Sequence, residues 1–255
     1  MITSKKMNVL ITNDDGYQSA NLRALAEALT SYANVFVFAP FEEQSGASHA
    51  FTVRHELVVK KHECASYELY SVEGTPADCA KFAIGHFAKE MGFRFDVCFS
   101  GINIGENSGV SAIYSGTVGG AREAALWDVP GIALSLHGHH CDMLDESIEF
   151  AKRVVKERLF DLIDNHTFWN VNFPKREDGP FMGYKATKMS LGMFTDHYSE
   201  TPKGWQLDGE KLWRQEPEDS DDYSLYHGYA TITPLRIDQT DTESLKKISE
   251  RIEVK

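Results

Sequence analysis

The sequence predicts an α/β protein built around a doubly wound, mostly parallel sheet. Short apolar runs alternate with helical patterns as far as Pro174, which is the order expected of repeated β-α-β units. Polar, glycine-rich stretches follow several of these runs, at the strand ends where such sheets bind ligands. The chain has 255 residues, 42% of them hydrophobic, which is ample material for one large core.

Each strand is predicted from an apolar, β-branched or aromatic run. The predicted buried strands cover residues 9–12, 34–40, 95–100, 131–136 and 168–174. Two half-exposed runs, 51–59 and 67–72, are interpreted as the arms of a hairpin. The glycine- and serine-rich stretch 101–117 is predicted as a long loop.

Each helix is predicted from apolar residues at a spacing of three or four. The predicted helices cover residues 22–29, 75–91, 118–128 and 145–163. Thr75 is suited to cap the second of these, since Pro76 follows it at the first helical position. These elements form a predicted core domain of residues 1–178.

Residues 179–255 differ in character and are predicted as a C-terminal extension. Residues 207–213, "LDGEKLW", suggest a hairpin with an Asp-Gly turn, and the acidic run 216–222 is interpreted as a solvated loop. A strand at 228–235 and a capped helix at 242–252 complete it. Because this segment has no evident core of its own, we expect it to pack on the core or on a neighbouring subunit.

The formal net charge of −12 argues against nonspecific binding of nucleic-acid polymers or anionic membranes, which requires basic patches. A small anionic substrate is compatible with this charge if a metal ion reverses the sign locally. We expect neither a signal peptide nor a membrane-spanning segment. The four cysteines form no C-x-x-C pair, so reduced thiols and a cytoplasmic location are expected.

Oxygen-bearing side chains follow three of the predicted strands. Asp14 and Asp15 come directly after the first strand, and Ser45 and Asn103 follow two later ones. Adjacent carboxylates repel one another unless a positive charge lies between them. An all-oxygen set with two negative charges suits a divalent ion such as Mg²⁺ or Mn²⁺, whereas turn formation is the alternative role of each residue taken singly.

The stretch Ser115, Gly116 and Thr117 begins a predicted helix, where free backbone N–H groups and the helix dipole favour a phosphate group. A simple N-cap is the alternative interpretation of Ser115. Three further residues beside the predicted strand ends complete the candidate phosphate-binding set: Asn13, Gly46 and Asn107. Neither G-x-x-x-x-G-K-[ST] nor a G-x-G-x-x-G after the first strand is present, which argues against P-loop and dinucleotide-binding sites.

The stretch 137–142, "HGHHCD", contains His137, His139, His140 and Cys141, which are soft ligands typical of zinc. Their spacing fits no common zinc pattern. A surface loop is the preferred interpretation, and the role of this stretch is left open.

Several motifs occur in an order that resembles the SurE (survival protein E) family. The motifs are "VLITNDDG", "AP…QSG", "GTPADC", "SGINIGENSG", "YSGTV" and, near the end, "DYSLYHGYATITPL". The resemblance implies a Rossmann-like core and a metal-dependent phosphatase acting on nucleoside monophosphates. It also implies one metal ion per subunit, held by Asp14, Asp15, Ser45 and Asn103, and a homodimer or homotetramer joined through the C-terminal extension.

The resemblance implies a 5′-nucleotidase, with 3′-nucleotidase and exopolyphosphatase activities left open. In the predicted mechanism the metal activates a water, Asp14 or Asp15 accepts a proton, and the residues from Ser115 to Thr117 hold the phosphate. A receiver-like phospho-acceptor module is one alternative, but the third aspartate that it needs is replaced by Ser100 and Asn103. A noncatalytic nucleotide-binding domain is the other.

Overall fold

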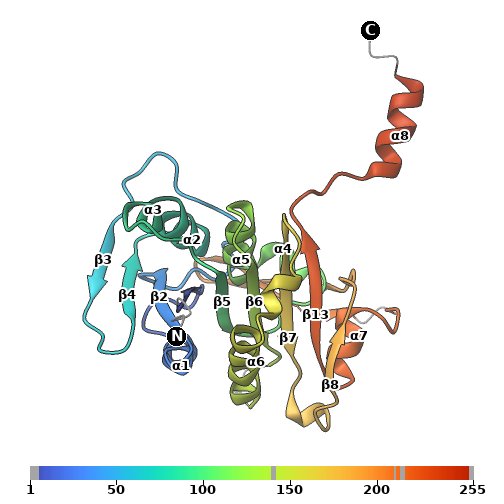
Figure 1. The fold of residues 1–255 in the computed structure, drawn as a ribbon. Helices are drawn as coiled ribbons and strands as arrows, with labels where there is room; N and C mark the ends of the chain where they lie inside the picture. The colour runs from blue at the N-terminus through green and yellow to red at the C-terminus, as the bar shows by residue number, and fades with distance from the viewer. Residues whose placement is uncertain (1–5, 139–141, 210, 213–215, 253–255) are drawn as a thin grey trace.

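A computed structural model of the chain describes residues 6–138, 142–209, 211–212 and 216–252 (Figure 1). Its centre is a nine-stranded sheet in the order β3-β4-β2-β1-β5-β6-β7-β13-β8. These strands are β1 (Met7–Thr12), β2 (Ala33–Pro40), β3 (Val59–His62), β4 (Glu68–Val72), β5 (Val97–Ile104), β6 (Gly131–Leu136), β7 (Thr167–Phe173), β8 (Gly183–Ala186) and β13 (Tyr229–Arg236). The run from β4 to β7 is parallel, which confirms the predicted α/β fold.

Helices cover both faces of the sheet (Figure 1). They are α1 (Ala20–Leu29), α2 (Pro76–Phe82), α3 (Ala88–Glu90), α4 (Ser111–Tyr114), α5 (Gly116–Leu126), α6 (Leu144–Lys156), α7 (Asp221–Tyr226) and α8 (Thr242–Arg251). α1 packs beside α6 on one face, and α2 packs against α5 on the other. Because both faces are covered, the central strands are apolar along most of their length, as in β1, where every residue from Asn8 to Thr12 is buried.

The strand order reverses between β1 and β5, because the chain runs from β1 to β2 in one direction and continues from β5 to β6 in the other. At such a switch point the loops beyond the carboxyl ends of neighbouring strands turn away from one another and leave a crevice. The loops after β1, β2 and β5 therefore meet at one edge of the sheet.

The local signals around Thr75 are confirmed. Its side chain accepts a hydrogen bond from the Asp78 backbone N–H, and Asp78 bonds back to the Thr75 N–H, so the two residues form a capping box. The helix continues through a π-helical turn at Ala83–Phe87 into α3.

Four predicted boundaries are wrong. The run 51–59 is mostly exposed and only Val59 joins β3, so the hairpin formed by β3 and β4 lies later in the chain. The predicted loop 101–117 contains the end of β5 and helix α4. The predicted helix 145–163 ends at Lys156, because Arg158 has a left-handed backbone (φ 54°) that no helix continues through. A separate 3₁₀ turn follows at Leu159–Leu162.

The fourth wrong boundary is the hairpin at 207–213. β11 (Gly204–Asp208) pairs with β10 (His197–Thr201), whereas β12 (Lys211–Leu212) pairs with β9 (Met193–Phe194). Gly209 lies between these pairs, and a Cβ there would stand 1.8 Å from the Thr195 carbonyl oxygen. Glycine is therefore needed here for a close crossing of two chain segments and not for a tight turn.

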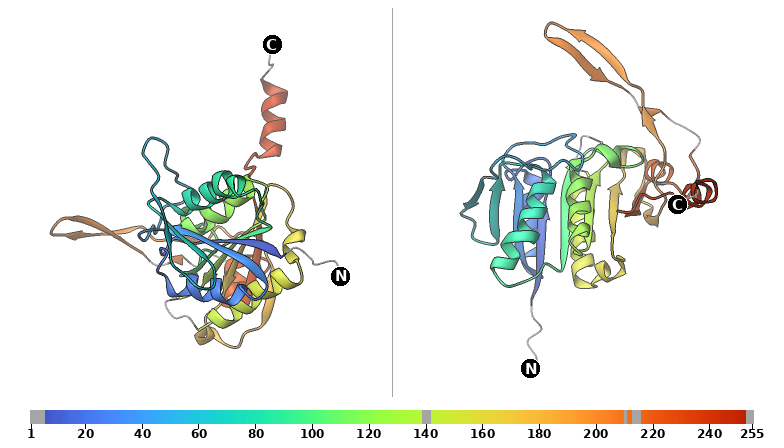
Figure 2. Two further views of the ribbon diagram at one scale, coloured as in Figure 1. Left: turned by 60° about the vertical axis from the view of Figure 1, so that its left-hand side comes forward. Right: turned by 90° about the horizontal axis from the view of Figure 1, so that it is seen from above.

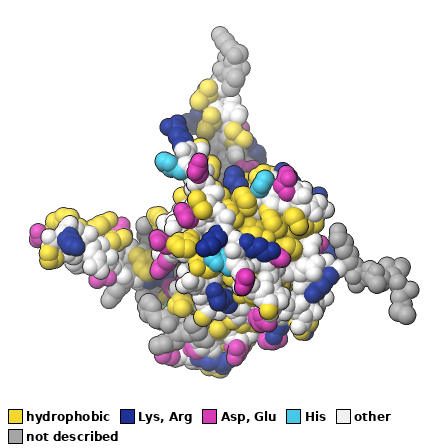
Figure 3. Space-filling view, turned by 90° about the vertical axis from the view of Figure 1, so that its left-hand side faces the viewer, with side chains coloured by type: hydrophobic (Ala, Val, Ile, Leu, Met, Phe, Trp, Pro, Cys, Tyr) yellow, Lys and Arg dark blue, Asp and Glu magenta, His cyan; other side chains and the backbone are white. Residues whose placement is uncertain are grey.

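The C-terminal extension contributes to the main sheet and also projects from it. β13 pairs with both β7 and β8, so two of its strands complete the sheet. Helix α8 stands away from the body (Figure 1), and so does the hairpin β10–β11 (Figure 2). Figure 3 shows hydrophobic side chains on the surface of this projecting hairpin. No helix among the described residues is long and apolar enough to cross a lipid bilayer.

Candidate active site

A pocket of about 320 Å³ lies where the loops after β1, β2 and β5 meet the start of α5. Six of the sequence-predicted site residues line it: Asp14, Ser45, Gly46, Asn103, Asn107 and Ser115. They come from four separate parts of the chain, and the parallel strand order brings them together. The other four predicted residues do not line the pocket: Asn13 and Asp15 flank Asp14 in the chain, and Gly116 and Thr117 follow Ser115.

The Asp14 side chain is 6% exposed and is held by the first turn of α5. The Thr117 hydroxyl donates to Asp14 Oδ1 over 2.5 Å, and the Thr117 backbone N–H donates to Oδ2 over 3.2 Å. The approach is close: a Cβ on Gly116 would lie 3.1 Å from Asp14 Cβ. The helix N-terminus and its dipole thus stabilise one carboxylate in a fixed orientation.

The two aspartates sit in an unfavourable electrostatic environment. Burial raises the pKa of Asp14, although the hydrogen bonds from Thr117 oppose the rise. Burial, together with the charges of Asp14 and Glu43, raises the pKa of Asp15 to about 6. A divalent cation beside both carboxylates would reverse these shifts, because it stabilises their charged forms.

Ser45 lies in an exposed loop whose position is set by its neighbours. Gln44 donates its backbone N–H to the Asp14 carbonyl oxygen over 2.7 Å, which joins this loop to the end of β1. Further along, the Ser48 hydroxyl donates to the Ile113 carbonyl oxygen over 2.7 Å. The Ser45 hydroxyl itself donates to Glu43 Oε1 over 2.5 Å. Its oxygen therefore keeps lone pairs available for another partner.

The same loop is anchored on α5 by Glu123, a nearly fully buried acid. His49 Nε2 lies 2.8 Å from one Glu123 oxygen, and Lys81 Nζ and Trp127 Nε1 bond the other at 2.9 and 2.8 Å. These bonds together outweigh the opposing effect of burial and lower the pKa of Glu123. Glu123 was not predicted as a site residue, although a charged residue among the alanines of "GGAREAAL" is a visible signal.

Asn103 is near the end of β5 and donates its Nδ2–H to the Gly105 carbonyl oxygen over 2.8 Å. This bond fixes the amide so that its oxygen is left as the group available to a cation. Asn103 therefore adds a neutral oxygen to the pocket that Asp14 and Ser45 line.

Asn107 is clamped by the polar residues of neighbouring strands. Its backbone N–H donates to Asn172 Oδ1 and its carbonyl oxygen accepts from Asn170 Nδ2, both over 2.7 Å. Its own Nδ2 donates to the Ser135 hydroxyl over 2.8 Å. Asn170 and Asn172 are not among the predicted site residues, although two amides in alternate positions of the buried run "FWNVNFP" are a signal for them.

The predicted phosphate-binding residues differ in their present contacts. The Ser115 hydroxyl accepts from the Val118 N–H and caps α5, and the Thr117 hydroxyl is engaged with Asp14. Asn13 is fully buried: its Nδ2 donates to the Gly16 carbonyl oxygen, while its Oδ1 has no hydrogen-bond partner. Gly46 lines the pocket with a left-handed backbone (φ 71°) that favours glycine.

A second pocket of about 390 Å³ adjoins the first, and both share Ser111, Tyr114 and Phe194. It is lined by Tyr114 from α4 and by Phe194 and Tyr198 from the extension. Three exposed aromatic rings thus surround a hollow beside the acidic pocket. Trp205 is exposed on β11 and does not line either pocket.

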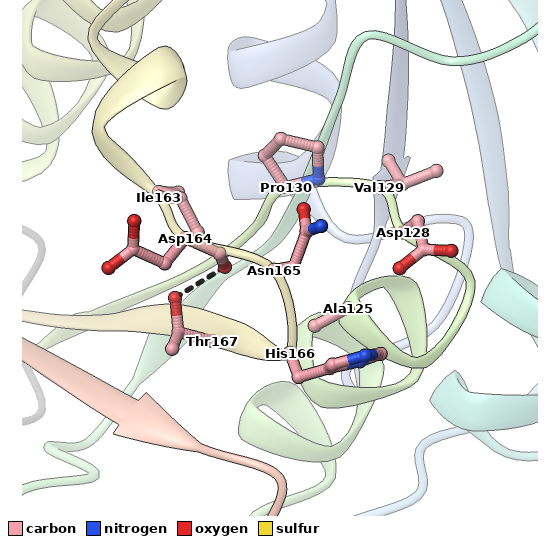
Figure 4. A pocket seen from close by; sticks show the side chains of 9 residues that line it. All are labelled: Ala125, Asp128, Val129, Pro130, Ile163, Asp164, Asn165, His166 and Thr167. Carbon is pink, nitrogen blue, oxygen red and sulfur yellow. Dashed lines mark hydrogen bonds between the residues drawn. The ribbon is translucent and has the colours of Figure 1, made fainter.

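A third cavity lies at the opposite edge of the sheet, beside the amino ends of β6 and β7 (Figure 4). It has a volume of about 20 Å³, and the Thr167 hydroxyl bonds the Asp164 carbonyl oxygen at its wall. Such a space holds about one water molecule. It is too small for a nucleotide and lies away from the residues described above.

The donor set at the acidic pocket fits a hard cation. Within the described residues, no cluster of three or more His, Cys, Asp and Glu side chains is arranged to hold a metal ion. The candidate set instead combines two carboxylates with a serine hydroxyl and an asparagine amide, all oxygen donors. His137 is buried against Tyr226, which does not fit a surface loop, while His139, His140 and Cys141 lie outside the described residues.

Comparisons with known proteins agree with this geometry. The model of the family described as "Survival protein SurE" matches residues 9–196. The chain is 37% identical over 256 residues to the 5′-nucleotidase SurE of Brevibacillus brevis, covering 95% of both chains. It is 35% identical over 257 residues to that of Thermosipho melanesiensis, covering 98% of this chain and 99% of the relative. The crystal structure of the SurE protein from Aquifex aeolicus superimposes with a TM-score of 0.80 at 33% identity, covering 95% of this chain and 98% of that one.

Proposed function

The chain belongs to the SurE survival-protein family, and on this basis we propose that it is a 5′-nucleotidase, which hydrolyses nucleoside monophosphates to nucleoside and phosphate. The observation that carries the proposal is the shared pocket: Asp14, Ser45 and Asn103 come from three strand ends and line one cavity. The relatives named 5′-nucleotidase SurE align with this chain over nearly their whole length, which supports the proposal.

The proposed cofactor is one divalent ion per subunit, Mg²⁺ or Mn²⁺, held by Asp14, Asp15, Ser45 and Asn103. The oxygen donors and the raised pKa values of the two aspartates support this assignment. When bound, such an ion lowers the pKa of a coordinated water and polarises the phosphoryl group.

The residues of the chain itself perform the remaining tasks. Thr117 orients Asp14, and one of the two aspartates accepts the proton of the attacking water. The first turn of α5, at Ser115 and Gly116, faces the phosphate with the positive end of the helix dipole. Asn107 lines the same pocket in a clamped position and is suited to bond a phosphate oxygen. Positioning and charge stabilisation supply most of the catalysis in phosphoryl transfer.

The adjoining pocket is the proposed site of the nucleoside. Tyr114, Phe194 and Tyr198 present aromatic faces on which a base can stack, in a pocket that adjoins the proposed phosphate site. Base stacking tolerates any base, because each has a π-face. The substrate is therefore a nucleoside monophosphate with its phosphate toward Asp14 and its base toward the extension.

Assembly through the C-terminal extension is also proposed. Every residue of α8 is at least partly exposed, and Leu245, Ile248 and Ile252 are more than half exposed. Apolar residues on a projecting helix are stabilised by burial against another surface. The proposed state is a homodimer or homotetramer in the cytoplasm. In each subunit, residues 1–178 form the proposed core and residues 179–255 the proposed extension.

The decisive test measures phosphate release from a panel of 5′- and 3′-nucleoside monophosphates and polyphosphate, with and without EDTA. We expect release from 5′-monophosphates that chelation abolishes. Asp14→Asn should abolish it while the protein stays folded, whereas Asp145→Asn, at an exposed position in α6, should leave it unchanged. Nucleotide binding that survives chelation without phosphate release would support a noncatalytic nucleotide-binding domain. A stable aspartyl-phosphate would support a receiver-like module.

A further inference from the structure

The acidic run 216–222 is only partly a solvated loop, since two of its acidic residues are buried. Asp221 is fully buried and Asp222 is 3% exposed, at the start of α7. Asp221 accepts hydrogen bonds from the backbone N–H groups of Gly109, Ser190 and Asp222. The carboxylate of Asp221 therefore fixes the end of the loop that follows Asn103 and Asn107.

Asp222 pairs with Lys211 on β12, whose side chain is largely shielded from solvent. Lys211 Nζ lies 2.5 Å from Asp222 Oδ1, and the exposed fractions of these side chains are 8% and 4%. The other Asp222 oxygen bonds the Ser190 hydroxyl. Desolvated charges are retained at such a position only when paired, so removal of one partner leaves an uncompensated charge.

Lys211 also reaches the loop that leads from Asn103 to α4. Its Nζ donates to the Ser108 hydroxyl over 3.1 Å and lies 3.8 Å from Glu106 Oε1. Ser108 and Lys211 are more than one hundred residues apart in sequence. Their contact therefore joins the C-terminal extension to the loop that forms one wall of the active-site pocket.

The strand that carries Lys211 holds one side of that pocket. In the β12–β9 pair, Lys211 is directly opposite Phe194, and its Nζ stands 5.9 Å from the Phe194 ring centre. Phe194 lines both the acidic pocket and the adjoining aromatic pocket. With only two residues in each strand, β9 and β12 are too short to be stable alone.

We propose that Lys211 is a positioning residue: through its buried ion pair with Asp222 and its bond to Ser108, it holds the Phe194 wall of the pocket against the active-site loop. The role of Lys211 in nucleotide binding rests on the proposed nucleotidase function. The positioning of Phe194 does not.

The phosphate side of the site has further anchors of its own. Asn107 is held by Asn170 and Asn172, and Asp14 by Thr117, none of which contacts Lys211 in the bonds described. Loss of Lys211 should therefore affect recognition of the nucleoside more than the chemistry at phosphorus.

The test compares Lys211→Met, which keeps the apolar stem, with Lys211→Arg, which keeps the charge. Lys188→Met is the matched control, because Lys188 forms an exposed ion pair with Asp219 in the same extension. Hydrogen–deuterium exchange is measured for the peptide that contains β9. Steady-state kinetics are measured with a nucleoside 5′-monophosphate and with p-nitrophenyl phosphate, which has no nucleoside.

For Lys211→Met we expect the amide exchange rate in β9 to rise about tenfold or more. Local opening of the β9–β12 pair in this variant no longer requires that the ion pair with Asp222 be broken. KM for the nucleotide should rise about tenfold, while kcat and the KM for p-nitrophenyl phosphate stay within about twofold. Lys211→Arg should keep the exchange in β9 and the nucleotide KM close to their wild-type values. Lys188→Met should change neither quantity. Unchanged exchange in β9, or equal KM changes for both substrates, would overturn the proposal.

The double variant Lys211→Met/Asp222→Asn separates positioning from stability. Removing both charges should recover thermal stability relative to the single variant, since Asp222 is then no longer a buried carboxylate without its lysine partner. The nucleotide KM should stay raised, because the link to Ser108 is still absent. A KM that recovers together with stability would show a purely structural role. A wild-type protein that releases no phosphate would refute the nucleotidase, whereas the exchange measurement would still decide the role of Lys211.

Discussion

Thr117→Val tests how the chain prepares Asp14 for a metal ion. The substitution removes the hydroxyl that donates to Asp14 Oδ1 over 2.5 Å and keeps the side-chain shape. The backbone N–H bond to Oδ2 is retained, so the carboxylate loses one of its two donors from Thr117. Thr117 is fully buried, and water cannot easily replace the lost hydroxyl.

The size of the effect follows from the charge of the acceptor. A hydrogen bond to a charged group contributes about 1.5–3 kcal/mol, which corresponds to roughly 10–100-fold in an equilibrium constant. Because the Thr117 bond lowers the pKa of Asp14, its removal raises that pKa further. Protons then compete more effectively with the metal, so the loss of metal affinity should grow as the pH falls.

The assay is a Mn²⁺ titration. Metal binding is measured by calorimetry, and activity is measured as phosphate release from a nucleoside 5′-monophosphate. We expect Thr117→Val to need about 10–100 times more Mn²⁺ for half-maximal activity, whereas Thr117→Ser, which keeps the hydroxyl, should resemble the wild type. Equal Mn²⁺ requirements in wild type and Thr117→Val would refute the orienting role of Thr117.

Three further predictions concern the surroundings of the site. Glu123→Gln should lower stability by about 1–3 kcal/mol and Tm by several degrees at pH 7. Since the folded protein lowers the pKa of Glu123, its contribution to stability is present above the usual value of 4.5 and is lost as the pH falls below it. A difference in Tm between wild type and Glu123→Gln that is the same at pH 7 and pH 4 would contradict the assignment. Gly119→Ala places a Cβ 2.2 Å from the Ser48 carbonyl oxygen and should displace the loop that carries Ser45. Phosphate release should fall about tenfold or more, and normal turnover would count against that contact. Leu245→Ser/Ile248→Ser should reduce the molecular mass seen by light scattering without loss of the core fold, while an unchanged mass would exclude α8 from the interface.

Much of the core could be predicted because its signals are local. The run from Val9 to Thr12 is apolar since both faces of β1 are covered, and the Thr75-Pro76 start of α2 depends on neighbouring residues alone. The residues that line the pocket follow strands whose parallel order was predictable, so the meeting of Asp14 and Asn103 followed from topology.

The errors arise where distant segments decide the structure. The acidic residues Asp221 and Asp222 are buried because Gly109 and Lys211, far away in sequence, supply donors. The roles of Asn170 and Asn172 depend likewise on a loop some sixty residues earlier in the chain. No local pattern shows which backbone groups such side chains will meet, and tertiary contacts of this kind override local propensity.

The most direct test of the proposed metal site is anomalous scattering from crystals grown with Mn²⁺. We expect one strong peak per subunit in the acidic pocket, at about 2.0–2.3 Å from oxygens of Asp14, Asp15, Ser45 and Asn103. A peak bound by other residues, or one that leaves Asn103 outside the coordination shell, would contradict the proposed metal site.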